Sequence, residues 1–471
     1  MDIDSLRGCL SGEAALPGNP VYDEGRTVWH PPARYREPLA VVRPTGTGDV
    51  ARTLRWARDE GVRVSPRSGG HSFDGFPVRP GCVLLDLSPM RDAGLEAKGL
   101  LRVQPGSRVL ALAEALAPAG RALPLGDCGT VAVGGLMAGG GFGYASRQFG
   151  LTIDNLVEAT VVTGNGEVLR VDADNAPPLY WSCRGGGGSA CIVTEFVIRS
   201  FVAGQVTAFD IVWDWAAARE ALLGFDAVIR SAPRKFDLKL KIRTTGDGRF
   251  LDSAAAGPQG CTPGTPFVEL SGQYLGPRAE AEALLAPLSD HPAAQKVLIR
   301  QEDYFDAVRE LLPLPGLNDP APPTLRPMRV ASDFVEGELR SGDVDVLVGF
   351  VDALQHARDL WGGCILLEPA DGAVNDVASA ATAYPHRKGR LVLQWEMIES
   401  SDPHAAGTAR LDDLLSNARE ALGPLLTGGR YVNYADRMDT AEDWWSANLG
   451  KLRSIAAAHD RSRTIVSRLY P

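Results

Sequence analysis

The sequence is poor in cysteine and in positive charge. Its seven cysteines among 471 residues are odd in number and form no Cys-x-x-Cys pair, which argues against both a disulfide framework and a metal site. Lysine and arginine number 48 against 58 aspartates and glutamates, so the formal net charge is −10. We therefore expect no nucleic-acid or membrane partner, and a small molecule as the ligand.

Long apolar runs and common catalytic motifs are also missing. Residues 1–7 lack a basic segment followed by an apolar one, and no apolar run reaches the roughly 18 residues of a spanning helix. We expect a cytoplasmic protein, either a monomer or a homodimer. The sequence contains no GxxxxGK[ST], GxSxG or HExxH motif, and no glycine run has a convincing Rossmann context. Kinase and hydrolase functions therefore lose their support.

Glycine, in contrast, is abundant and gathers in three loops. The first follows a predicted strand at 62–65 and contains His71, the second contains Cys128 and continues to Gly143, and the third spans 181–188. Because glycine has no Cβ, such loops can approach an anionic group and point successive backbone N–H groups at it. The first loop is therefore a candidate phosphate cradle with a nucleophilic imidazole at its tip.

The pattern of elements predicts an α+β fold. Near the N-terminus we expect a helix at 50–60, capped by Asp49, and another at 109–117, between strands at 38–44, 62–65, 82–87 and 101–104. Beyond residue 205, alternation with period two predicts antiparallel strands with one wet face, at 206–215, 236–243, 267–274 and 391–399. Helices are expected between them, at 216–231, 278–288, 343–358 and 406–421. Residues 312–327 read as an irregular loop.

The loops, their order and the closing segments around Tyr434 and Trp444 resemble the berberine-bridge-enzyme-like branch of the vanillyl-alcohol oxidase superfamily, over nearly the whole chain. The resemblance implies a two-part PCMH-type FAD-binding domain with an inserted substrate domain of antiparallel sheet backed by helices. The implied boundaries are 1–203 for the main FAD-binding part, 204–424 for the substrate domain and 425–471 for the returning segment.

The resemblance also implies how FAD is bound. His71 matches the histidine that bonds the 8α-methyl group, and Cys128 matches the cysteine that bonds C6 of the same ring. The alternative is a surface turn with a solvated histidine and a buried apolar cysteine. Backbone N–H groups of the first loop would contact the pyrophosphate, while glycines of the second loop would lie against the flavin. These residues are Arg67, Ser68, Gly69, Gly70 and Ser72, then Gly134, Gly135, Gly140 and Gly141, with Val193 as a further backbone contact.

Oxidation by a flavin needs a base, and the resemblance implies Tyr434 for that role. A tyrosinate could take the substrate proton, with Asn433 orienting the flavin or the base. The alternative is a core tyrosine bonded to Asp436. On the strand at 391–399, Gln394 and Glu396 share one face. Gln394 would bind substrate if it faces the flavin, and Glu396 would replace it if the register slips.

These features predict an FAD-dependent oxidase that moves a hydride from an alcohol or lactol to covalent flavin, with dioxygen as the final acceptor and hydrogen peroxide as by-product. A sugar or a natural product is the expected substrate class. The alternatives are an amine oxidase, an oxidative cyclase of secondary metabolism, and a flavin-bearing protein that binds a drug for resistance.

Overall fold

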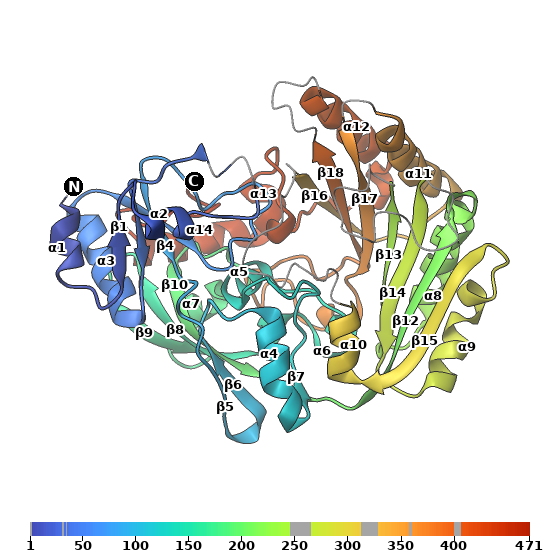
Figure 1. Cartoon of the computed structure of the whole chain (residues 1–471), viewed down its shortest axis with the longest axis horizontal. Coiled ribbons are helices and arrows are strands. Elements are labelled where there is room, and N and C mark those ends of the chain that lie inside the picture. Colours follow the sequence, from blue (N-terminus) through green and yellow to red (C-terminus); the bar gives the residue numbers. More distant parts are fainter. Residues whose placement is uncertain are drawn as a thin grey trace.

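The computed structural model describes residues 2–30, 33, 35–244, 265–311, 328–357, 360–399 and 407–471. It has an α+β fold with two lobes (Figure 1). One lobe contains both chain termini, and the other contains a large antiparallel sheet with helices on its outer face. In the described parts of the chain, no helix is long and apolar enough to cross a membrane.

The first sheet of the N-terminal lobe has the strand order β1-β2-β4-β3. Its strands are β1 (Glu13–Ala15), β2 (Ala40–Arg43), β3 (Arg63–Arg67) and β4 (Cys82–Asp86), with helices α1 (Ile3–Arg7), α2 (Pro20–Gly25) and α3 (Thr47–Asp59). Strands β2, β4 and β3 are parallel, so β2, α3 and β3 form the expected β-α-β unit. Asp49 does not cap α3, since the N-cap is Gly46. Its buried carboxylate accepts instead from the backbone N–H groups of Ser11, Gly12 and Thr45.

The second sheet has the order β5-β6-β10-β8-β9 and lies beside the first. Its strands are β5 (Ala93–Leu95), β6 (Leu100–Val103), β8 (Leu156–Thr163), β9 (Val168–Asp172) and β10 (Cys191–Arg199). Helices α4 (Val109–Leu116), α5 (Val133–Gly139), α6 (Ser146–Phe149) and α7 (Pro177–Ser182) connect them, and the short strands β7 (Arg121–Ala122) and β11 (Phe201–Val202) pair with each other. Helix α5 follows the Cys128 loop directly.

The C-terminal segment returns to this lobe. Helices α13 (Ala441–Trp445) and α14 (Leu449–His459) lie against it, and Val64 of β3 exchanges backbone hydrogen bonds with the strand-like residues Thr464 and Val466, at 2.7 and 2.8 Å. The end of the chain thereby extends the sheet next to the strand that leads into the His71 loop. The domain boundaries given above stay a prediction, but the lobe is built from both ends of the sequence.

The second lobe is a seven-stranded antiparallel sheet with the order β15-β12-β14-β13-β17-β18-β16. Its strands are β12 (Gln205–Asp214), β13 (Phe236–Arg243), β14 (Phe267–Tyr274), β15 (Ala294–Asp303), β16 (Met328–Val335), β17 (Leu360–Pro369) and β18 (Leu391–Glu399). Its helices are α8 (Ala218–Ser231), α9 (Arg278–Ser289), α10 (Tyr304–Leu311), α11 (Ser341–His356) and α12 (Gly407–Ala421). One face of the sheet packs with helices in a single apolar core that includes Leu240, Ile365 and Trp395. The other face is polar.

Four strands and four helices predicted for this lobe form within a few residues of the expected bounds. Strands β15, β16 and β17 were not predicted, because their sequences are interrupted by charges, prolines or glycines. The predicted loop at 312–327 lies outside the described residues.

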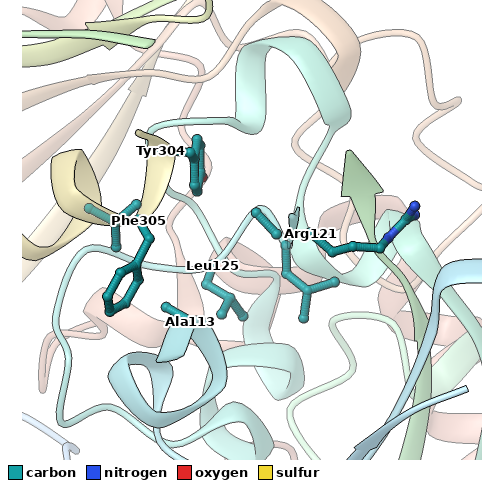
Figure 2. Close-up of a pocket in the computed structure, with 8 residues that line it drawn as sticks. Ala113, Arg121, Leu125, Tyr304 and Phe305 are labelled. Atoms are coloured by element: carbon teal, nitrogen blue, oxygen red, sulfur yellow. The ribbon is translucent and has the colours of Figure 1, made fainter. Parts of the chain in front are cut away.

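The contacts that join the two lobes include a buried arginine and a small apolar contact. Arg147 of α6 is 3 % exposed; its guanidinium bonds Asp371 at 2.7 and 3.2 Å and the Phe236 carbonyl at 2.5 Å. Nearby, α10 lies across α4, where Figure 2 shows Leu125 and Ala113 facing Tyr304 and Phe305 in a pocket between the lobes. A charged link and an apolar one therefore both contribute to the relative position of the two sheets.

Removing the Arg147 side chain should destabilise the whole protein. Arg147→Ala leaves Asp371 and several buried carbonyls without their donor, a loss of about 3–5 kcal/mol for a buried pair. We expect a Tm lowered by several degrees in a thermal melt followed by circular dichroism. Arg453→Ala, which removes an exposed pair with Glu442, is the control and should move the Tm by less than about one degree. Equal melting of the two variants would contradict this role of Arg147.

Candidate active site

His71 lies in the loop after β3, partly buried against aromatic and hydroxyl neighbours. Its ring stacks on Trp29 with centroids 4.7 Å apart, and its Nε2 lies 2.9 Å from the Thr130 hydroxyl. Burial, helped by the cations Arg108 and Arg67, lowers the pKa of His71 to about 4. At neutral pH the imidazole is uncharged, which is the form that acts as a nucleophile.

Cys128 meets His71 at the same threonine. Its Sγ lies 3.5 Å from the Thr130 hydroxyl, so two side chains far apart in the sequence converge on one group. Burial raises the pKa of the Cys128 thiol, although the Thr130 hydroxyl partly offsets this effect. The thiol is therefore protonated at neutral pH and needs to lose its proton before it can attack.

The backbone of the first loop presents unused donors. In the described part of the chain, no acceptor bonds the backbone N–H of Gly69, Gly70 or His71, and Gly70 has φ +76°. A Cβ on Gly69 would lie 2.8 Å from the backbone nitrogen of Ala132, so only glycine lets this loop touch the start of α5. Consecutive free N–H groups beside a helix start form a site for an anion such as a pyrophosphate.

The polar side chains of this loop are occupied within the protein. Arg67 bonds Asp86 at 2.6 Å, Ser68 donates to the Pro105 carbonyl at 2.5 Å, and Ser72 donates to Asp74 at 2.7 Å. They hold the loop in shape and leave its backbone free to meet a ligand, and the contact of this loop with a pyrophosphate stays a prediction. Val193, on β10, is partly buried against the core and carries no polar contact of its side chain.

The glycines of the second loop divide into two groups. A Cβ on Gly134, Gly140 or Gly141 would meet Pro105, Tyr431 or Thr152 respectively, at 2.7, 3.3 and 2.3 Å. Their small size is thus required by protein neighbours, and the expectation that they lie against a flavin is not needed to explain them. Gly135 is exposed, and a Cβ there would meet nothing within 4 Å. Of these four glycines, Gly135 alone has open space beside it.

The C-terminal segment holds the His71 loop from outside. Arg468 bonds Asp74 at 2.8 Å, and its guanidinium lies between the rings of Phe76 and Trp444, 4.6 and 5.4 Å from their centroids. The loop is therefore fixed by residues that arrive last in the chain.

Tyr434 lies at the end of a buried chain of charges. Its hydroxyl donates to Glu368 at 3.3 Å, Glu368 is ion-paired with Lys239, and Lys239 bonds Asp127 at 2.9 Å. Lys239 and Glu368 are 1 % and 2 % exposed. Because Asp127 adjoins Cys128, the chain connects the proposed base to the Cys128 loop.

The charge state of Tyr434 differs from the tyrosinate expected from the sequence. Burial, and then the carboxylates of Glu368 and Asp127, raise the pKa of Tyr434 well above its ordinary value. Burial also raises the pKa of Glu368, which Lys239 partly offsets. The phenol is therefore neutral, and Glu368 is the group placed to accept its proton.

The alternative interpretation of Tyr434, a core tyrosine bonded to Asp436, names the wrong partner. Asp436 is bonded to Arg329 at 2.6 Å and not to Tyr434. Asn433 donates to the Leu136 carbonyl and to the Tyr431 hydroxyl, both at 3.1 Å, and a Cβ on Gly139 would lie 2.4 Å from its side chain. Asn433 thus fastens the Tyr434 segment to α5, beside the Cys128 loop.

Gln394 and Glu396 share the polar face of the large sheet, as alternation predicts. Gln394 donates to Glu396 at 3.0 Å, and Glu396 also accepts from the Cys364 thiol at 3.0 Å. Leu393 and Trp395 lie in the core on the other face. Gln394 pairs with Leu366, two residues from Glu368 on the same face of the sheet. No slip of register is therefore needed to bring Gln394 toward the site.

Four groups of this site escaped the sequence reasoning: Thr130, Asp127, Lys239 and Glu368. The first two flank Cys128 and could have been found as its neighbours. Lys239 stands in the alternating strand at 236–243, whose wet face was predicted. Glu368 follows the apolar Leu366-Leu367 and precedes proline, and no local pattern distinguishes it.

Comparison with known proteins agrees with this geometry. Residues 38–172 match the model of the FAD binding domain family. The glucooligosaccharide oxidase of Sarocladium strictum is 25% identical over 448 residues, covering 90% of this chain and 85% of that protein. The carbohydrate oxidase of Microdochium nivale is 27% identical, covering 97% and 92%. The chain is therefore an FAD-linked oxidoreductase that is similar to these oxidases over most of its length.

Solved structures share its fold over the full length. A berberine-bridge-enzyme-like protein from Physcomitrella patens superimposes with a TM-score of 0.86 at 23% identity, covering 99% of this chain and 98% of that one. Glucooligosaccharide oxidase from Acremonium strictum, with 6-S-cysteinyl, 8α-N1-histidyl FAD, gives a TM-score of 0.86 at 22% identity, with 100% and 99% coverage. The fold is thus one in which a large antiparallel sheet accompanies the FAD binding domain.

Loss of the Arg468 side chain should loosen the His71 loop. In Arg468→Ala, Asp74 loses its cation and Phe76 loses its stacked neighbour, so we expect faster hydrogen exchange in peptides covering 68–76, measured by mass spectrometry. Arg461→Ala, at an exposed position of the same segment, should leave that exchange unchanged. Unaltered protection in Arg468→Ala would show that the loop is held by other contacts.

Proposed function

We propose that this oxidase binds FAD through two covalent bonds, from His71 and Cys128, and oxidises a hydroxyl group of a sugar. The observation that carries the proposal is the meeting of both nucleophiles at the Thr130 hydroxyl. Two groups within reach of one small side chain can bond two positions on the same edge of one flat ring. The sugar oxidases among the relatives, and the histidyl and cysteinyl flavin of one of them, support it.

The residues present fit such a cofactor. Nε2 of His71 is engaged by Thr130, which leaves Nδ1 to form the bond, and the lowered pKa keeps the ring neutral. The free backbone N–H groups of Gly69 and Gly70 suit the pyrophosphate. Gly135 leaves space beside the loop.

Bound FAD supplies the hydride acceptor, and dioxygen is the proposed final acceptor, so that one carbinol and one dioxygen give one carbonyl and one hydrogen peroxide. The chain's own residues handle the proton of the carbinol oxygen. Tyr434 receives that proton at its hydroxyl while it passes its own to Glu368. Lys239 keeps Glu368 ionised enough to accept it.

The polar face of the large sheet supports a polyhydroxylated substrate. Arg243, Glu269, Gln394 and Glu396 lie on the same face as Glu368, and all are partly or fully buried. A face rich in buried donors and acceptors fits a sugar, whose hydroxyl groups need partners when they leave water. No contact among the described residues specifically favours the alternatives, which are an amine oxidase, an oxidative cyclase and a drug-binding flavoprotein.

Covalent attachment is tested by acid precipitation of the purified protein followed by intact-mass measurement. We expect the mass of one FAD on the chain, retained in His71→Ala and in Cys128→Ala, since each leaves one bond, and lost in the double variant. Cys183→Ala, which removes a buried thiol outside the site, is the control and should keep both bonds. Flavin released freely from the unmodified chain would refute the proposal.

The proton path is tested at Lys239. Lys239→Met removes the cation that lowers the pKa of Glu368, so the ionised carboxylate forms only at higher pH. We expect flavin reduction at pH 7 to slow by about 100-fold, and the acidic limb of its pH profile to move up by at least about one unit. Stopped-flow reduction with the best substrate from an oligosaccharide panel measures both.

Lys239→Arg keeps the charge and should restore most of the profile. A uniformly slower Lys239→Met enzyme, with the pH profile of the unmodified chain, would show that Lys239 only supports the fold.

A further inference from the structure

Lys241 lies on the polar face of the sheet with an ammonium that has no partner. It is two residues from Lys239 on β13, so both side chains leave the same face. In the part of the chain that the structure describes, no carboxylate or hydrogen-bond acceptor is paired with its Nζ. It is half-buried.

The neighbouring cations on this face all have carboxylate partners. Lys239 is held by Asp127 and Glu368, while Arg243 bonds Glu269 at 3.0 Å. At the far edge of the sheet, on the same face, Lys296 of β15 bonds Asp210 at 2.5 Å. Lys241 therefore differs from the other cations of the face in having no anion of its own.

The strand pairing fixes where Lys241 lies relative to the reacting group. Lys239 is aligned with Glu368, the partner of Tyr434. The next row along the strands pairs Gln394 with Leu366, Leu366 with Lys241, and Lys241 with Glu269. Rows on one face are about 7 Å apart, close enough for side chains of both rows to contact one ligand. Lys241 and Gln394 thus flank Leu366 one row from the proton path.

Lys241 is charged under ordinary conditions. Burial lowers its pKa, but the charge of Glu269 and the phenol of Tyr144 outweigh burial, and the net shift is upward. Since Glu269 is already engaged by Arg243, the ammonium keeps its capacity for another anion. A half-buried cation without a partner has lost part of its hydration without compensation. An incoming carboxylate would compensate for this loss through a charge-assisted hydrogen bond.

We propose that Lys241 binds a carboxylate of the substrate, so that the site prefers a sugar acid to the neutral sugar of the same skeleton. This inference rests on the proposed sugar-oxidase function and narrows its substrate class. Leu366 supplies an apolar contact for the ring, and Gln394 lies on the other side of it for a hydroxyl group.

The test compares matched pairs of probes, D-glucuronate with D-glucose and D-galacturonate with D-galactose. Their dissociation constants are measured by isothermal titration calorimetry without oxygen, on enzyme whose flavin has first been reduced with dithionite so that it cannot accept a hydride, at constant ionic strength. We expect the unmodified chain to bind the uronates more tightly, and Lys241→Met to weaken uronate binding by about 10- to 100-fold, the range for a charge-assisted contact. Binding of the neutral sugars should change little.

Lys241→Arg keeps a cation and should retain the preference, and Lys296→Met removes a cation of the same face that is already paired and should leave it intact. Equal binding of acid and neutral sugar, no binding of either uronate, or a preference that survives in Lys241→Met overturns the inference. The proposed function fails by a different result, the absence of flavin reduction with every sugar tested. Because binding is read without turnover, the two failures are distinguishable.

Discussion

A buried ammonium between two carboxylates is the interaction on which the site depends. Lys239 is almost inaccessible to water, and such a charge is tolerated only where partners replace its hydration. Its partners come from different parts of the chain: Asp127 from the loop that bears Cys128, and Glu368 from β17 of the sheet. The need to pair one cation twice therefore fixes the distance between the cofactor loop and the carboxylate that bonds Tyr434.

The close approach of loops around this charge explains much of the glycine content. Gly69 touches the start of α5, and Gly139 touches the side chain of Asn433 at distances that exclude any Cβ. These contacts bring the His71 loop, the Cys128 loop and the returning C-terminal segment together. Glycine here serves the packing of protein on protein, and the backbone donors of the first loop are left over for a ligand.

The sequence was most informative where the determinants are local. Period-two alternation located β13 within its true bounds, and the two nucleophiles stood out because glycine surrounds them. It was least informative about long-range partners. Glu368 became visible only when strand pairing set it beside Lys239, and the protonated state of Tyr434 follows from burial that no local pattern encodes. Asp49 shows the same limit, because its carboxylate serves a distant segment in place of its own helix.

The arrangement of the sheet also separates cofactor binding from substrate choice. The strands place apolar side chains in the helix-backed core and polar ones toward the cofactor loops, so exchanges on the polar face need not disturb the core. Within that face, the row with Lys239 and Glu368 is tied to Asp127 and is constrained by the proton path. Among the described residues, the next row, with Gln394, Leu366 and Lys241, makes no ion pair or hydrogen bond to the cofactor loops, and Lys241 acts on Asp127 only through its charge. Substitution there changes what the site recognises and leaves the proton path in place, and this is the physical reason to seek substrate specificity one row away from the base.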